Sequence, residues 1–223
     1  MVQPLGDPFS NEETERTAGA AGALAASVRD LIDAVVRSEV DADELDSIRG
    51  EVDALTKRLR VRQLPGSFGE THGMSSALRA WGNAVIGLRN AIAPPMANEW
   101  LADGTVVGRA TLGTAYEGPP GRAHGGVAAL LLDQVMGEAA HAAERPGFTA
   151  YLTLNYRNPT PLGTIRAEAK AEAPEPGQEH KTIVLGTLYA VDDDGTETVC
   201  VEADGMFILP RDVRERMARE GQE

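Results

Sequence analysis

The segment from His124 to Ala143 constrains the fold of this 223-residue chain more than any other part of the sequence. Its first half holds the uninterrupted apolar run Val127-Ala128-Ala129-Leu130-Leu131-Leu132, which leaves a helix without a polar face. A helix that is apolar all round is expected to be buried on every side, and a curved sheet wrapped around it would bury it. The run is far too short to cross a bilayer, so we expect no membrane span.

Asp133 follows this run directly, in the middle of the predicted buried helix. An unpaired carboxylate there destabilises the fold by several kcal/mol unless it is protonated, has a partner or lies beside a cavity. Two interpretations stay open at this point. Asp133 either lies on a wet face or pairs with an arginine, or it is a functional carboxylate suited to general-base chemistry.

The helix is expected to begin at His124-Gly125-Gly126, after a loop rich in proline and glycine (117–123). Backbone N–H groups at a helix N-terminus lack intrahelical acceptors and carry partial positive charge. Glycine also allows a ligand to approach closely. Such a site can hold a phosphate or polarise a carbonyl, although the glycines can equally serve only to permit the turn.

Gly125 and Asp133 are eight residues apart in the sequence. At 1.5 Å of rise per residue they lie roughly 12 Å apart along one helix, so both cannot act on one carbonyl within one chain. They can act together if two such helices run antiparallel across a two-fold axis. If both serve one substrate, the site is therefore shared between two subunits.

The sequence after residue 104 alternates with period two on both sides of this helix, which indicates strands. The run Asp192-Asp193-Asp194-Gly195 marks a tight hairpin turn between two of them. One helix and a mostly antiparallel sheet make an α+β domain, with the helix covering one face of the sheet. The predicted strands are Val106 to Leu112, Thr149 to Tyr156, 163–173, 181–191 and 197–208.

A helical extension is predicted before this domain, with the boundary near residue 95. Two amphipathic helices are expected between Asn11 and about Arg62, joined near Ser38–Asp41 and stopped by Pro65-Gly66. Their apolar stripes indicate a packing or oligomerisation arm. The predicted organisation is a helical N-terminal extension (1–95), an α+β domain (96–210) and a polar tail (211–223).

Charge and cysteine content exclude several classes of protein. The 21 basic and 34 acidic residues give a net charge of −13, which argues against nucleic acid or an anionic membrane as partner. Cys200 is the single cysteine, so an intrachain disulfide and a multi-cysteine zinc site are excluded. Met1 to Ser10 lacks the basic flank and apolar core of a signal peptide, so we expect a cytoplasmic protein. No metal is expected, because His72, His141 and His180 have no spaced partners.

The chain resembles the hotdog-fold acyl-CoA thioesterases, specifically the PaaI-like and human thioesterase-superfamily-member branch, in the segment GPPGRAHGGVAALLLDQVMG followed by TAYLTLNYRNPTPLG. The family pattern is HGG with an aspartate nine residues after the histidine, here His124 and Asp133. The resemblance covers roughly residues 90–210. It implies a long helix wrapped by a curved antiparallel sheet, dimers joined edge to edge and often paired into tetramers, and hydrolysis of acyl-CoA to CoA and a free acid without metal or other cofactor.

The resemblance also implies roles for single residues. The backbone N–H of Gly125 would polarise the thioester carbonyl, and Asp133 of the opposite subunit would act as nucleophile or general base. His124 would orient the loop, and Thr149, sixteen residues after the aspartate, would assist. Thr153 is a weaker candidate for that assisting threonine. Some family members carry Asn or Gln six residues before the histidine to position water, whereas this chain has Gly118.

The phosphates of CoA need local cations on this acidic protein. Arg157 is the first candidate, with Asn158 beside it, and Gly126 would lie against the ligand. Solvated surface charge is the alternative explanation for each cation. A non-catalytic acyl-CoA-binding or regulatory hotdog protein remains the alternative function, while a hotdog dehydratase would want another arrangement of Asp and His. Weaker candidate cations are Arg122, Arg166, Lys170 and Lys181.

Overall fold

The computed structural model describes residues 11–64, 66–68, 80–178, 180–211 and 213–214. The chain divides into two compact units, Met1–Ala93 and Pro94–Glu223. Pro65, His72 and most of the predicted polar tail lie outside the described residues.

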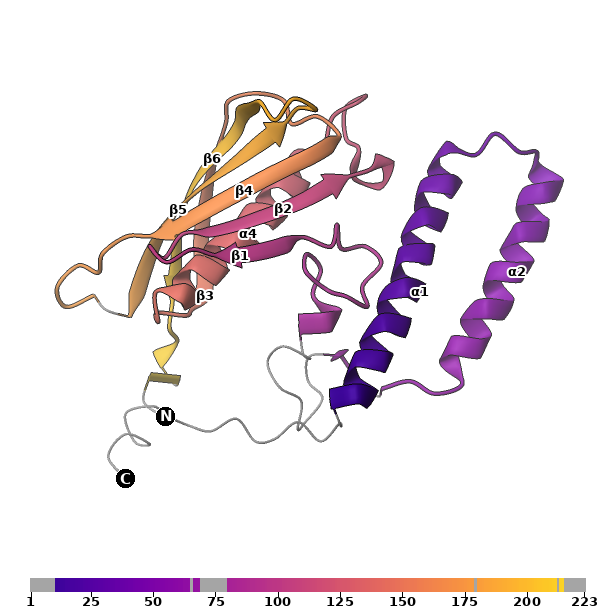
Figure 1. The fold of residues 1–223 in the computed structure, drawn as a ribbon, viewed down its shortest axis with the longest axis horizontal. Helices are drawn as coiled ribbons and strands as arrows, with labels where there is room; N and C mark the ends of the chain where they lie inside the picture. The colour runs from indigo at the N-terminus through magenta and orange to yellow at the C-terminus, as the bar shows by residue number, and fades with distance from the viewer. Residues whose placement is uncertain (1–10, 65, 69–79, 179, 212, 215–223) are drawn as a thin grey trace. The chain divides into compact units, whose positions relative to one another are not determined.

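The first unit contains the two expected helices, α1 (Asn11–Arg37) and α2 (Ala42–Arg60), shown in Figure 1. Asp41 caps α2, because its side-chain Oδ1 accepts the N–H of Glu44 at 3.0 Å. Within this unit Ala25 of α1 is buried, and Arg29 donates its Nε–H to the carbonyl of Ala93 at 3.0 Å. The apolar stripe of α1 is therefore partly covered inside its own unit.

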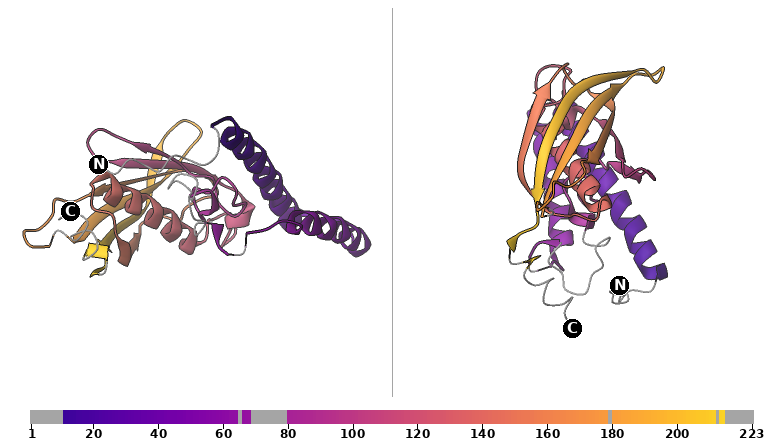
Figure 2. Two further views of the ribbon diagram at one scale, coloured as in Figure 1. Left: turned by 90° about the horizontal axis from the view of Figure 1, so that it is seen from below. Right: turned by 90° about the vertical axis from the view of Figure 1, so that its left-hand side faces the viewer.

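The second unit is one six-stranded sheet and one long helix (Figure 1). The strand order is β1-β2-β4-β5-β6-β3, and every neighbouring pair is antiparallel. Figure 2 shows the curvature of the sheet, with α4 along one of its faces. The elements are β1 (Ala97–Trp100), β2 (Val106–Leu112), α4 (Gly125–Ala142), β3 (Phe148–Tyr156), β4 (Gly163–Ala171), β5 (Lys181–Val191) and β6 (Glu197–Ile208), with a short 3₁₀ turn at Thr114–Tyr116. This confirms the expected α+β hotdog architecture.

The core lies between α4 and the sheet. Leu131, Leu132 and Met136 are fully shielded from solvent and face the alternating inward residues of the strands, such as Ile165 and Leu188. Burial of this apolar surface is the main driving force for the unit. Among the described residues, no helix is long and apolar enough to span a membrane.

The prediction that α4 is buried on every side is wrong for the single chain. Its buried residues form one stripe, and Leu130 on the other side is 41% exposed. An open sheet covers one side of a helix and leaves the opposite side uncovered. The apolar composition of α4 thus exceeds what its own sheet can bury.

The strand β1 was not predicted, and it adds a sixth strand to the five expected. Its sequence Ala-Asn-Glu-Trp has no apolar alternation, and most of it is exposed. Backbone pairing with β2, from Ala97 opposite Arg109 to Trp100 opposite Val106, holds it in the sheet. The fourth strand also ends at Ala171, before the predicted 173.

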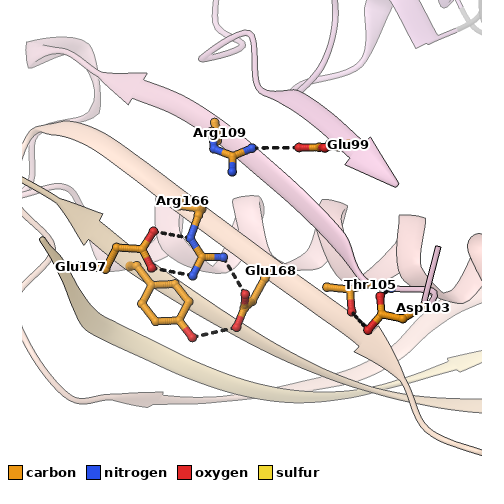
Figure 3. A network of polar contacts seen from close by, with 8 residues as sticks. Glu99, Asp103, Thr105, Arg109, Arg166, Glu168 and Glu197 are labelled. Carbon is orange, nitrogen blue, oxygen red and sulfur yellow. Dashed lines mark hydrogen bonds and ion pairs between the residues drawn. The ribbon is translucent and has the colours of Figure 1, made fainter. Parts of the chain in front are cut away.

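The outward face of β4 carries an ion network, drawn in Figure 3. Arg166 lies over the ring of Tyr189 at 4.2 Å and donates to Glu197 at 2.5 and 2.7 Å and to Glu168 at 2.6 Å. The hydrogen bonds from Arg166 lower the pKa of Glu197. Burial raises the pKa of Glu168, but hydrogen bonds from Arg166 and Tyr189 outweigh it and the net shift is downward.

This network makes stability depend on pH. Because both glutamate pKa values lie below the ordinary 4.5, the unfolded chain binds more protons, so the contribution is present above pH 4.5 and is lost as pH falls through the folded values. We expect Arg166→Met to lower the free energy of unfolding by about 1–3 kcal/mol at pH 7. Urea denaturation at pH 7 and pH 3.5 checks this. The difference in the free energy of unfolding between wild type and variant should be smaller at pH 3.5, and an equal difference at both pH values would contradict the role given to this network.

Candidate functional site

The loop before α4 is held by its own hydrogen bonds. Glu117 accepts the N–H of Gly121 through Oε1 at 2.6 Å, and the N–H of Gly118 donates to the carbonyl of Arg122 at 2.9 Å. The N–H of His124 then donates to the carbonyl of Tyr116 at 2.9 Å. These contacts fix the direction in which the chain enters the helix.

Gly118 has no room for a side chain. A Cβ placed there would lie 2.8 Å from the Cα of His124 and 3.1 Å from its Cβ. Because the nearest atom is backbone, a larger residue would displace the start of α4. The position at which some family members carry Asn or Gln is therefore closed by packing here, and no water-positioning amide can stand at it.

His124 is the N-cap of α4. Its φ of −63° and ψ of 137° are extended, and its Nδ1 accepts the N–H of Gly126 at 3.0 Å. The ring proton is accordingly assigned to Nε2. The amide of Gly126, predicted to face the ligand, is thus engaged by the cap, and His124 fixes the first turn of α4 through this hydrogen bond.

The amide of Gly125 is in a different situation. No residue in the described part of the chain accepts its N–H, whereas the carbonyl of Gly125 accepts the hydroxyl of Tyr156 at 2.9 Å. The N–H of Val127 already donates to the carbonyl of His124 at 2.9 Å. The Gly125 N–H, which the sequence analysis had singled out, is therefore available to a ligand. It lies at the N-terminal end of α4, where the helix dipole favours negative charge.

Asp133 lies two turns further along α4 and is half-buried. Its Oδ1 accepts the hydroxyl of Thr149 at 2.8 Å, so the threonine at the start of β3 holds the carboxylate in place. Among the described residues Asp133 has no arginine or lysine partner within ion-pair distance. The carboxylate therefore keeps its other oxygen available.

A bulge in β3 places two polar side chains against the same helix. Thr149 pairs with Phe207 and Tyr151 pairs with Met206, so the register shifts between them. The shift brings Thr149 and Tyr156 to the face that α4 covers, although they are seven positions apart and an odd spacing in a regular strand puts two side chains on opposite faces. Thr153, opposite Asp204, lies on the outward face and does not reach α4.

Tyr156 was missed by the sequence analysis. Strict alternation from Thr149 puts position 156 on the outward face, and only the bulge reverses that assignment. An aromatic residue with a hydroxyl at the end of a strand gave no separate indication of contact with Gly125.

A cavity of about 470 Å³ opens beside the start of α4. It brings together Gly125, Arg157 and Asn158, three of the predicted site residues, with Arg122 and Tyr156. Asp133 and Thr149 do not line it. Within one chain the structure thus groups the predicted ligand-binding residues with the amide but leaves the carboxylate apart.

The candidate cations differ in what already binds them. Arg157 pairs with Glu202 at 2.7 Å, but both side chains are about half exposed, so a phosphate can compete with this weak pair. Asn158 donates to the carbonyl of Val199 at 2.8 Å. Arg166 belongs to the network on β4, and Lys170 binds Asp103 at 2.8 Å and lowers its pKa to about 2.

Arg122 and Arg157 are consequently the cations that line the cavity beside Gly125. Lys181 donates to Gln178 at 2.8 Å, away from that cavity. Within the described residues no group of histidine, cysteine and acidic side chains is arranged to hold a metal ion.

Comparisons with known proteins agree on one family. The thioesterase superfamily model matches residues 120–173. The acyl-coenzyme A thioesterase THEM4 of Xenopus laevis is 43% identical over 97 residues, which are 43% of this chain and 41% of that protein. The chain thus spans about two-fifths of the length of this curated relative. A solved crystal structure of a thioesterase superfamily protein is 30% identical, aligns with a TM-score of 0.70, and covers 84% of this chain and 94% of that one.

Proposed function

The chain belongs to the thioesterase superfamily, and on that premise we propose that it is an acyl-CoA thioesterase, which hydrolyses acyl-CoA to CoA and a free carboxylic acid. The observation that carries the proposal is the state of α4: the Gly125 N–H has no acceptor among the residues that the structure describes, and Asp133 is held by Thr149. One group can stabilise a developing oxyanion and the other can act on carbonyl carbon or water.

Two copies of the chain complete the site. Gly125 and Asp133 lie eight residues apart on α4, roughly 12 Å along its axis, so one thioester cannot reach both groups of one helix. A two-fold axis beside β3 would run the two α4 helices antiparallel and bring the amide of one copy to the carboxylate of the other.

The edge of the sheet supports this arrangement. β3 is the last strand in the order, so its outer side has no partner among the described residues. Phe148, Tyr151 and Leu130, which lie on β3 and on the open side of α4, are 72%, 44% and 41% exposed. Joining two β3 edges would cover them and the open side of α4 together. We propose this homodimer, with pairing into tetramers as the family often shows.

Hydrolysis of the thioester takes two steps if Asp133 is the nucleophile and one step if it is the general base. If Asp133 is the nucleophile, its carboxylate attacks the thioester carbon and expels CoA as thiolate, and water then hydrolyses the mixed anhydride. If Asp133 is the general base, it takes a proton from water, which attacks the same carbon. In both cases negative charge develops on the carbonyl oxygen, where the Gly125 N–H of the other subunit donates.

The CoA moiety is proposed to lie in the cavity beside Gly125. Arg157 would receive a phosphate in exchange for Glu202, and Arg122 and Asn158 line the same cavity. Gly126 does not line this cavity and its N–H is bound by His124, so its proposed part is only to keep the approach to the first turn of α4 free of a side chain. The negative net charge of the protein makes this local cluster necessary.

The decisive assay measures free thiol released from a panel of acyl-CoAs, short, long and aromatic, with a thiol-reactive chromophore. We expect turnover with at least one member. Tight binding of the panel without thiol release would instead identify the non-catalytic acyl-CoA-binding module. No binding and no release would remove both functions.

Tyr156 is proposed as a positioning residue for the Gly125 peptide. Tyr156→Phe keeps the ring and removes the hydroxyl that donates to the Gly125 carbonyl. We expect kcat to fall by about 3- to 10-fold with little change in KM, because a single neutral hydrogen bond is lost. An equal rise in KM without loss of kcat would indicate a role in ligand binding alone.

A further inference from the structure

The apolar residues of α2 form a regular seam. Spacings of three, four, three and four residues separate its members, the heptad pattern of two-stranded coiled coils. A seam this narrow fits one partner helix and is too narrow for the face of a sheet. Its members are Leu45, Ile48, Val52, Leu55 and Leu59.

This seam is only partly covered in the single chain, where Ile48 and Val52 are of intermediate exposure and Leu59 borders a hollow beside α1. None of the side chains of α2 is buried, and Leu45, Leu55 and Leu59 are 46%, 52% and 57% exposed. A helix of 19 residues gains most of its stability in a protein from packing of its apolar face. A partner outside the single chain would supply that packing.

The charges of α2 select the kind of partner. Asp43 and Glu44 lie in its first turn, and Lys57, Arg58 and Arg60 lie in its last turn. A second α2 running in the same direction would place like charges together, whereas an antiparallel one places acidic ends against basic ends. The helix is therefore electrostatically complementary to itself in one orientation.

The middle of α2 adds no attraction to this pairing. Arg49 lies between Asp46 and Asp53 on its own helix, at 3.2 and 3.6 Å, and offsets one of the three negative charges of the central turns, the third being that of Glu51. Exposed ion pairs of this kind contribute little to stability, so the apolar seam carries the association and the terminal charges set its direction.

We propose that α2 pairs with the α2 of a second copy of this chain as an antiparallel coiled coil across a two-fold axis. Glu44 and Arg58 each precede a seam residue, so they occupy equivalent flanking positions. In the antiparallel pair Glu44 of one copy lies opposite Arg58 of the other. This interface is separate from the proposed catalytic pairing through β3.

Cysteine cross-linking of the full chain tests both the contact and its direction. Cys200, the native cysteine, is fully buried, so an introduced surface cysteine is the reactive thiol. Glu44→Cys and Arg58→Cys proteins are oxidised alone and as a mixture, and covalent dimer is measured on a non-reducing gel. We expect dimer in the mixture only, because two copies of position 44 lie roughly 21 Å apart in the antiparallel pair.

A matched pair of variants links the cross-link to the seam. Leu55→Lys introduces a charge on the seam, and Ala54→Lys introduces the same charge on the neighbouring face. In the mixed cysteine proteins, the first should reduce cross-linking at least fivefold and the second should leave it unchanged, with circular dichroism confirming equal helix content.

Cross-linking of Glu44→Cys with itself would show a parallel pair, and absence of any cross-link would show that α2 does not bind its own copy; either result overturns the proposal. The measured quantity is covalent dimer and not hydrolysis, so the result for the coiled coil is independent of whether the chain is a thioesterase.

Discussion

Replacing Asp133 by asparagine is expected to lower kcat for thioester hydrolysis by about 10³-fold or more. The amide keeps the size of the side chain and can still bind the Thr149 hydroxyl, which now donates to the carboxylate at 2.8 Å. It can neither attack a carbonyl nor take a proton from water. Steady-state thiol release, with the oligomeric state measured by light scattering, separates lost chemistry from lost assembly.

Glu138 offers the matched control on the same helix. Its carboxylate accepts a hydrogen bond from the side chain of Gln134 at 2.9 Å, and Glu138 lies more than one helical turn beyond Asp133. Glu138→Gln removes one negative charge from α4, as Asp133→Asn does, and should leave kcat near the wild-type value. Wild-type turnover in Asp133→Asn would rule out this residue as nucleophile or base, whatever the Glu138 variant does.

Replacing Gly125 by proline is expected to lower kcat by about 10²- to 10³-fold, the usual effect of removing one oxyanion donor. Proline has no N–H, and the first position of a helix is where proline is best accommodated. The preceding His124 already has ψ of 137°, the backbone region that proline requires of its neighbour. The substitution therefore deletes the donor and keeps the helix.

Gly125→Ala is the control, because it keeps the N–H and adds a Cβ where proline also has one. That Cβ would lie 3.3 Å from the Tyr156 hydroxyl oxygen, a contact a side chain can relieve by a small movement. We expect this variant to retain most of the activity. Equal losses in the alanine and proline variants would assign the effect to crowding and not to the missing hydrogen bond.

Mixing the two inactive proteins tests whether the site is shared. A dimer of one Asp133→Asn copy and one Gly125→Pro copy has one site with both wild-type groups and one site with neither. With random exchange half of the dimers are mixed and half of their sites work, so roughly a quarter of the wild-type activity should return. A site built within one chain would regain nothing.

The sequence allowed much of the second unit to be predicted for a physical reason. An apolar run without a polar face indicates a buried helix, and period-two alternation indicates half-buried strands, so α4 and five strands were found within a few residues of their bounds. β1 escaped because edge pairing through the backbone needs no apolar side chains. The burial of α4 was overestimated because the apolar run shows how apolar the helix is and not which side of it is covered. Only part of the helix faces its own sheet, and Leu130 lies on the uncovered side.

The candidate site was only partly predictable. The family resemblance singled out both Asp133 and Thr149, and their side chains meet at 2.8 Å. Tyr156 could not be placed, because one extra residue in β3 reverses the parity of the strand and no local sequence pattern marked the bulge. The pairing of Arg157 with Glu202 likewise depends on the register between β3 and β6, which brings together residues 45 positions apart.

The tight contact between Gly118 and the backbone of His124 limits what protein engineering can do at this loop. No larger residue fits position 118 as the loop stands, since a Cβ there would lie 2.8 Å from the Cα of His124 and would displace the helix cap. Introducing an amide side chain at this position would therefore require the loop to be rebuilt at the same time.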